Sequence, residues 1–275
     1  MDIVHPETRP KPRWRPTPLT AVSMLLHAAA PATALMLPDT WPLAVGAIAG
    51  NHVVLGFAGL RPRSSLLGPN VTRLPAASAA RGELALTIDD GPDPLVTPQV
   101  LDILDRYGAK ASFFCVGDEA LRHPELCREI GRRGHAVENH SQTHSPYFAA
   151  FGPRRIAVEV DRGQQTLRAL TGETPRFFRP TAGLRNAFLD PVLARRGLQL
   201  ASWTRRGFDT RERRADVVFR RLARNLGGGD ILTLHDGNSA RTAAGVPVIL
   251  EVLPRLLLAI RDAGLRLVTL RSAIP

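Results

Sequence analysis

Two apolar segments without charged residues, 19–37 and 41–60, stand at the start of the chain. Each approaches the length of about 20 residues that a membrane-spanning helix needs. The short PDT sequence between them can form a turn, so the pattern predicts a helical hairpin. Both segments are rich in alanine and glycine and contain His27, Asn51 and His52. A shallow or re-entrant hairpin is therefore an alternative to full crossing of a membrane.

Beyond residue 83, short apolar runs alternate with amphipathic stretches. The apolar runs predict seven strands, at residues 84–88, 111–116, 135–139, 176–178, 198–203, 231–234 and 266–270. The stretches between them predict helices, among them 97–108, 124–134, 154–172 and 246–264, which all end in glycine. Because alternating strands and helices build parallel sheets or barrels, we expect an α/β fold.

The pattern divides the chain into a basic, proline-rich tail (1–18), the hydrophobic hairpin (19–60), a linker (61–80) and a main domain (81–275). Basic residues flank the hairpin but are absent from its turn; they are Arg9, Lys11, Arg13 and Arg15 before it and Arg61, Arg63 and Arg73 after it. The positive-inside rule then predicts an inner-membrane protein whose main domain faces the cytoplasm. A cleaved signal peptide fits poorly, because a second apolar segment follows the first.

The formal net charge of +11 comes almost entirely from arginine, since Lys11 and Lys110 are the only lysines. Such an excess suggests an anionic partner, or simply a solvated basic surface. Eight arginines lie between Arg205 and Arg224 and could contact a phosphate or an anionic membrane, or form the exposed face of a helix. We exclude a nucleic-acid module, because no interleaved aromatics or recognition motif accompany the charge. Cys115 and Cys127 lack metal-ligand spacing and are expected to be buried thiols.

Polar residues follow four of the predicted strands directly. Asp89 and Asp90 follow the first strand, His140 the third, Arg179 the fourth and His235 the sixth. In parallel α/β folds, function lies at the carboxyl ends of the strands. These positions therefore predict an active site.

The sequence HSQTH spaces His140 and His144 four residues apart. On a helical turn the two rings would share one face and could hold a single metal ion. A carboxylate from another strand end would complete a His-His-Asp set with open positions, as in catalytic zinc sites. One aspartate of the adjacent pair Asp89 and Asp90 could then bind the metal while the other acts as a general base, and the cation would offset their repulsion.

The motifs TIDDGP (87–92), HSQTH (140–144), FFRP (177–180) and LTLH (232–235), in this order and spacing, resemble the polysaccharide deacetylase family, which has the NodB-homology domain and is also called carbohydrate esterase family 4. The resemblance covers residues from about 80 to the end of the chain. It implies a distorted (β/α) barrel with about seven strands, and metal-dependent removal of an N- or O-acyl group from a sugar.

Carried over by position, the resemblance implies that Asp89 is the catalytic base and that Asp90, His140 and His144 are the metal ligands. It implies that His235 is the general acid that protonates the leaving amine. The metal would be zinc, with cobalt, manganese and nickel as alternatives, because a His-His-Asp site accepts several ions.

Other positions match the family less closely. Arg179 would pair with Asp89 and keep it ionised. Asp209, in the stretch RRGFDT, matches one acid of a family motif, and we expect it to act on the Arg179 side of the site. Leu234 would wall the acyl pocket, although an alternating leucine also suits any core.

Ala182 stands where the family has an aromatic residue, which suggests a differently shaped acceptor. Its backbone N–H could still serve the oxyanion. Trp203, at the end of the fifth predicted strand, is a further candidate for substrate contact.

We therefore predict a membrane-associated, metal-dependent deacylase that removes an acetyl group from the sugar of a polysaccharide or lipid-linked saccharide. A cytoplasmic orientation favours a lipid-linked substrate. One alternative is an extracytoplasmic enzyme acting on peptidoglycan or an exopolysaccharide. Another is an inactive fold that binds glycan or lipid, which would require a missing base, ligand or acid, and none is missing. The sequence leaves the oligomeric state open.

Overall fold

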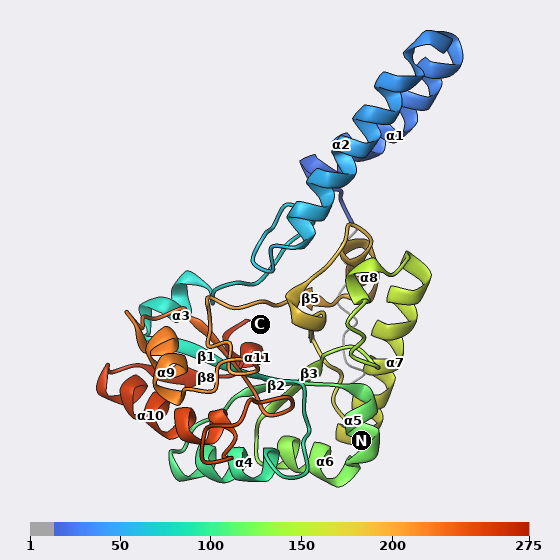
Figure 1. The fold of residues 1–275 in the computed structure, drawn as a ribbon. Coiled ribbons are helices and arrows are strands. Elements are labelled where there is room, and N and C mark those ends of the chain that lie inside the picture. Colours follow the sequence, from blue (N-terminus) through green and yellow to red (C-terminus); the bar gives the residue numbers. More distant parts are fainter. Residues whose placement is uncertain (1–13, 275) are drawn as a thin grey trace, which may run out of the picture.

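The computed structural model describes residues 14–274 and shows a hairpin of two helices projecting from an α/β domain (Figure 1). The hairpin consists of α1 (Pro18–Met36) and α2 (Trp41–Gly59), joined by the 3₁₀ turn η1 (Pro38–Thr40). This confirms both predicted apolar helices, which are long and apolar enough to cross a membrane. The first 13 residues of the predicted tail, with Arg9, Lys11 and Arg13, lie outside the described residues.

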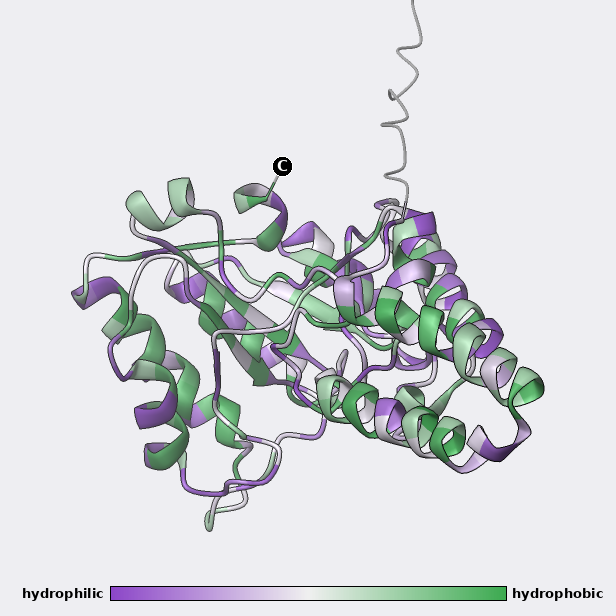
Figure 2. Ribbon diagram, turned by 90° about the horizontal axis from the view of Figure 1, so that it is seen from above, coloured by the Kyte–Doolittle hydropathy of each residue, from purple (hydrophilic) through white to green (hydrophobic). Residues whose placement is uncertain are grey.

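The hairpin exposes its apolar side chains and pairs its polar ones between the two helices. Apolar residues predominate along both helices (Figure 2), and the exposed ones include Leu25, Leu35, Trp41, Leu43 and Val53. Across the helix pair, His27 Nε2 lies 3.2 Å from His52 Nε2, and Asn51 donates to the Ser23 hydroxyl at 2.8 Å. The polar residues inside the apolar segments therefore serve helix–helix contact.

The domain contains a parallel sheet that curves into a half-barrel, which confirms the predicted fold class. Its strands are β1 (Glu83–Asp89), β2 (Ser112–Cys115), β3 (Ala136–Asn139), β4 (Phe177–Phe178), β5 (Gln199–Leu200), β6 (Arg205–Arg206), β7 (Ile231–His235) and β8 (Arg266–Val268). They follow the order β5-β4-β3-β2-β1-β7-β6, and β8 pairs with the first half of β1. All seven predicted strands are present, and the two-residue β6 is an addition.

Helices cover the sheet and bury its apolar residues. They are α3 (Ala76–Ala80), α4 (Thr97–Arg106), α5 (Gly117–Arg122), α6 (Pro124–Arg132), α7 (Pro153–Thr171), α8 (Leu189–Arg196), α9 (Ala215–Ala223), α10 (Val248–Asp262) and α11 (Leu270–Ala273), with 3₁₀ turns η2 (Phe148–Ala150) and η3 (Thr181–Gly183). The largest core cluster joins α4, α6, α9 and α10 to β1, β2 and β7. Every residue of β1 is buried, which explains why residues 84–86 and 88 are all apolar.

Residues 61–80, expected to be a linker, lie against the domain. Leu67 and Leu74 are buried, and Val71 forms a bridge with Ala201. The buried Arg185 side chain donates to the carbonyl of Ser64. Residues 61–80 are therefore fixed by contacts with the α/β domain. The predicted division of the chain into domains stays a prediction. Cys115 and Cys127 are buried free thiols, as expected.

Candidate active site

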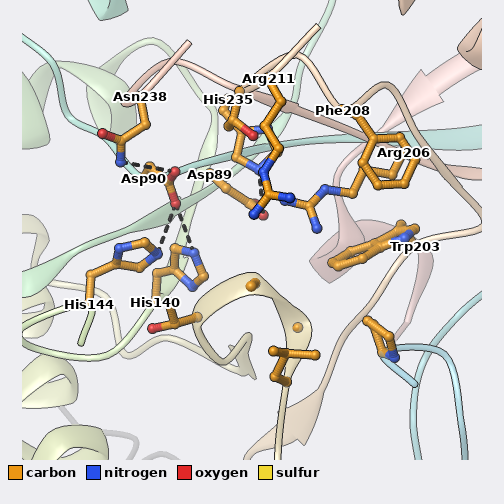
Figure 3. Close-up of a pocket in the computed structure, with 16 residues that line it drawn as sticks. Asp89, Asp90, His140, His144, Trp203, Arg206, Phe208, Arg211, His235 and Asn238 are labelled. Carbon is orange, nitrogen blue, oxygen red and sulfur yellow. Dashed lines mark hydrogen bonds and ion pairs between the residues drawn. The ribbon is translucent and has the colours of Figure 1, made fainter. Parts of the chain in front are cut away.

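The residues predicted at the strand ends converge on one cavity of about 360 Å³. Asp89 and Asp90 come from the end of β1, His140 follows β3, and His235 ends β7. Figure 3 shows their side chains pointing toward one another, with His144 beside His140. This convergence follows from the parallel sheet, because the carboxyl ends of its strands meet at one edge.

Asp90, His140 and His144 form a candidate metal site. Asp90 Oδ1 lies 3.1 Å from Nε2 of each histidine, and the three possible ligand atoms all lie within 4.8 Å of one another. Two imidazoles and one carboxylate match the donor set of catalytic zinc. The His140 Nδ1–H donates to the Arg179 carbonyl at 2.7 Å, which leaves Nε2 free to bind a metal. Asn238 donates to Asp90 Oδ2 at 3.2 Å and orients the carboxylate. The residues present therefore fit a divalent ion.

The segment that carries the two histidines is a loop, so the predicted helical turn is wrong. Ser141 and His144 adopt left-handed backbone conformations, with φ of 66° and 50°. Asn139 Oδ1 accepts from the Ser141 N–H at 2.8 Å, and the Ser141 hydroxyl accepts from the His144 N–H at 3.1 Å. These local hydrogen bonds fold the chain back, and the ring centres of His140 and His144 are 4.7 Å apart. The spacing therefore identified two histidines that lie together, although they lie in a loop and not on a helical turn.

Arg179 pairs with Asp89, as predicted. It is fully buried and donates to Asp89 Oδ1 at 2.5 Å and to the Thr87 hydroxyl at 2.9 Å. Its other two guanidinium nitrogens donate to the carbonyls of Ala201 (3.0 Å) and Ser202 (2.8 Å). Burial lowers the pKa of Arg179 and Asp89 opposes this effect. A fixed guanidinium fork therefore orients the Asp89 carboxylate and leaves its Oδ2 turned toward the cavity.

Asp209 contacts His235, so the expectation that it acts on the Arg179 side is wrong. Its Oδ1 lies 2.8 Å from His235 Nδ1, and its Oδ2 accepts the His235 backbone N–H at 2.8 Å. All three guanidinium nitrogens of Arg179 are already engaged, because they donate to Asp89, Thr87 and two carbonyls. Burial lowers the pKa of His235, but the Asp209 carboxylate, with smaller contributions from Asp89 and Asp90, outweighs burial and raises it to about 9. His235 Nε2 then faces Asp89 Oδ2 at 4.0 Å.

Ala182 and Trp203 line the cavity, whereas Leu234 does not. Ala182 lies in η3 with φ of 56°, a left-handed conformation that turns the chain at the cavity wall. Leu234 is fully buried in the main core instead. Side chains alternate along β7, so Leu234 points to the helices while His235 points to the cavity.

Several residues that line the cavity were not predicted, among them Pro62, Phe208 and Asn238. Arg206 and Arg211 belong to the arginine-rich run that was noticed but could not be placed in space. Pro62 comes from the presumed linker, and no local signal marks it as part of an active site.

Asp236, the residue that follows His235 in the sequence, is a buried acid that was not predicted as part of the site. It accepts a hydrogen bond from the Thr97 hydroxyl at 2.5 Å and one from the Gly237 N–H at 3.0 Å. Burial raises the pKa of Asp236 to about 7, because these two hydrogen bonds do not fully replace lost hydration.

Comparison with known proteins places this site among related enzymes. The profile of a family described as "Polysaccharide deacetylase" matches residues 77–201. The chain is 32% identical over 193 residues to a peptidoglycan-N-acetylglucosamine deacetylase of Bacillus cereus, covering 70% of this chain and 87% of the relative. It is 29% identical over 197 residues to a chitooligosaccharide deacetylase of Sinorhizobium fredii, covering 70% and 91%. The structure of a family 4 carbohydrate esterase from Streptomyces lividans in complex with acetate matches with a TM-score of 0.62 at 31% identity, covering 70% and 95%.

Proposed function

Since this chain belongs to the polysaccharide deacetylase family, the carbohydrate esterase family 4 of amidohydrolases, we propose that it removes the acetyl group from an N-acetylated sugar of a glycan next to a membrane. The observation that carries the proposal is the geometry of Asp89. Its Oδ1 is held by Arg179, and its Oδ2 lies 4.0 Å from His235 Nε2 in the cavity that Asp90, His140 and His144 also line. A base, an acid and three metal ligands thus surround one cavity.

Asp90, His140 and His144 would hold one divalent ion, zinc first, with cobalt, manganese and nickel as alternatives. When bound, the ion would supply Lewis acidity toward the acyl carbonyl and toward water. The chain itself fixes the ligands. The Arg179 carbonyl orients the His140 ring, and Asn238 orients the Asp90 carboxylate.

Asp89 is the proposed general base. Its Oδ2 would take a proton from the attacking water, while Arg179 places a fixed positive charge beside the carboxylate and keeps it correctly turned. The backbone N–H of Ala182, in the turned segment at the cavity wall, would donate to the developing oxyanion.

His235 is the proposed general acid. Because Asp209, together with Asp89 and Asp90, raises its pKa to about 9, the imidazole is protonated at neutral pH. Its Nδ1–H stays bonded to Asp209, and its Nε2–H would pass to the sugar nitrogen as the amide C–N bond breaks. Acetate and a free amine are the products.

We propose peptidoglycan or an exopolysaccharide outside the cytoplasmic membrane as the substrate, with α1 and α2 as the membrane anchor. The support is the similarity to relatives named as peptidoglycan and chitooligosaccharide deacetylases. The prediction of a cytoplasmic domain acting on a lipid-linked sugar rests only on flanking charge, three residues of which lie outside the described chain. The orientation is tested by protease treatment of cells that carry a C-terminal tag on the protein and whose cytoplasmic membrane is intact while the outer layers are permeabilised. Cleavage of the tag is expected, and full protection would contradict the proposed orientation.

The function is tested by acetate release from N-acetylated peptidoglycan fragments and chitin oligomers, with Asp89→Asn as the matched inactive control. Release by the wild-type protein and its loss in Asp89→Asn are expected. Equal rates in both proteins would remove Asp89 from the mechanism, and no release from any N-acetylated glycan would refute the proposed function.

A further inference from the structure

A second groove opens beside the catalytic cavity, at the point where the hairpin joins the domain. It has a volume of about 750 Å³. The two share a wall made of Pro62, Trp203, Arg206 and Phe208. The rest of the second groove comes from residues 60–66, which follow directly after α2. A ligand in this groove would therefore lie between the end of the apolar hairpin and the catalytic residues.

The second groove is lined by guanidinium groups without a carboxylate. Arg61, Arg63 and Arg206 line it, and Arg211 lies on the catalytic side. Within residues 14–274, no carboxylate lies within 4.0 Å of a side-chain nitrogen of these four arginines. Neighbouring arginines of the same run are neutralised, for Arg205 pairs with Asp230 at 2.9 Å and Arg214 pairs with Glu212 at 2.9 Å. The positive charge is thus left free where the two cavities meet.

Arg206 lines both cavities, whereas Arg61, Arg63 and Arg211 each line one of them. Its Nε is buried and has no hydrogen-bond partner among the described residues. Its guanidinium lies over the rings of Trp203 at 5.0 Å and Phe208 at 5.4 Å, so the side chain is positioned rather than free in solvent. Figure 3 shows Arg206 and Arg211 across the cavity from His140 and His144. Because the Nε is closed off from the groove, an anion at the junction of the two cavities would meet the terminal nitrogens of this positioned guanidinium.

The wall that presents these arginines is rigidly held. Ser202 donates to the Pro62 carbonyl at 2.7 Å, and Asn70 donates to the same carbonyl at 2.8 Å. Arg63 donates to the Thr204 carbonyl at 3.0 Å, and the buried Arg185 donates to the carbonyl of Ser64. The segment after the hairpin is therefore built into the active site, and its geometry is set before a ligand binds.

We propose that this groove binds a phosphate group carried by the substrate, so that the enzyme also accepts such a glycan while its sugar is still attached through phosphate to a membrane lipid. Guanidinium groups recognise phosphate through paired N–H donors. The exposed side chains of Leu60, Leu66 and Phe208 line the same groove and suit the apolar chain that follows such a phosphate. With the phosphate at Arg206, the attached sugar lies in the adjoining cavity. This inference rests on the proposed deacetylase function and adds a substrate class to it.

The test compares two substrates that differ only in the phosphate: dodecyl N-acetylglucosaminide and dodecyl N-acetylglucosaminyl phosphate, both with the full-length protein in detergent. The readout is the ratio of kcat/KM for the phosphate substrate to that for the neutral one. We expect a ratio of about ten or more in the wild type, and a fall of about tenfold in Arg206→Gln and in the double variant Arg61→Gln, Arg63→Gln. Arg220→Gln is the matched control, because Arg220 is exposed on α9, away from both cavities, and should leave the ratio unchanged.

Three outcomes would overturn the inference. A ratio near one in the wild type, with good turnover of the neutral substrate, removes the phosphate subsite but leaves the deacetylase function intact. In a second outcome, the arginine variants bind phosphatidylglycerol vesicles more weakly than the wild type but keep its high ratio of kcat/KM. The groove then binds phosphates of the bilayer and not the phosphate of the substrate. No acetate release from either dodecyl substrate or from chitin oligomers removes the proposed function, and the subsite with it.

Discussion

The link between Asp209 and His235 predicts a specific pH profile. In the Asp209→Asn variant, His235 loses the largest of the carboxylate contributions that raise its pKa to about 9, while burial still lowers the pKa and Asp89 and Asp90 still raise it. We expect the pKa of His235 to fall to its ordinary value of about 6.5 or below. At pH 8 the protonated fraction then falls from about 0.9 to about 0.03, a loss of about 30-fold in the active acid form. At pH 6 the same change leaves about three quarters of the acid form.

The assay is kcat for acetate release between pH 5.5 and 10. The wild type should lose activity only as pH rises through about 9, whereas Asp209→Asn should lose it more than two pH units lower. Thermal unfolding at pH 6 controls for a structural defect, since the asparagine side chain has a single acceptor oxygen in place of the two carboxylate oxygens through which Asp209 contacts His235. A loss of equal size at pH 6 and pH 8, in a folded variant, would refute the role of Asp209 in keeping His235 protonated.

Three further predictions concern other parts of the site. Arg179→Lys should lower kcat by about a hundredfold or more, because a single ammonium nitrogen cannot hold Asp89 and also reach the Ala201 and Ser202 carbonyls that fix the guanidinium; unchanged kcat would contradict the pairing. Asp236→Asn should raise the free energy of unfolding at pH 8 by roughly 2–4 kcal/mol. Because the folded-state pKa of Asp236 is raised to about 7, its carboxyl group stabilises the fold at low pH, and this stabilisation is lost as pH rises from about 4 through 7. Chemical denaturation at pH 4 should therefore show no gain. His144→Ala should weaken zinc binding at least tenfold in a calorimetric titration, with Arg220→Gln as the unaffected control.

The strands and the core of the site follow from local patterns. Residues 84–88 of the buried β1 are apolar except for Thr87, and the end of this run marks Asp89 and Asp90 without knowledge of the fold. A parallel sheet brings strand ends together, so His140, Arg179 and His235 could be expected at the same edge. Their predicted proximity depends on topology alone and needs no side-chain detail.

The errors concern contacts that sequence spacing does not determine. Asp209 contacts His235, which lies 26 residues further along the chain, and the groups that engage the Arg179 guanidinium come from other segments. The loop at His140 depends on left-handed residues and side-chain hydrogen bonds, which an i, i+4 pattern cannot reveal. Pro62 reaches the cavity through a segment with a linker-like composition, held there by Asn70 and Ser202. Such long-range polar contacts become visible only in three dimensions.

The central claim is that a metal held by Asp90, His140 and His144 works with Asp89 to deacetylate a glycan. The most direct test titrates zinc into chelator-treated full-length protein and follows acetate release from an N-acetylated glycan oligomer. We expect activity to be absent without metal and to saturate at one ion per chain, and expect Asp89→Asn to bind zinc while releasing no acetate. Full activity in the metal-free protein, or normal activity in metal-loaded Asp89→Asn, would contradict the account.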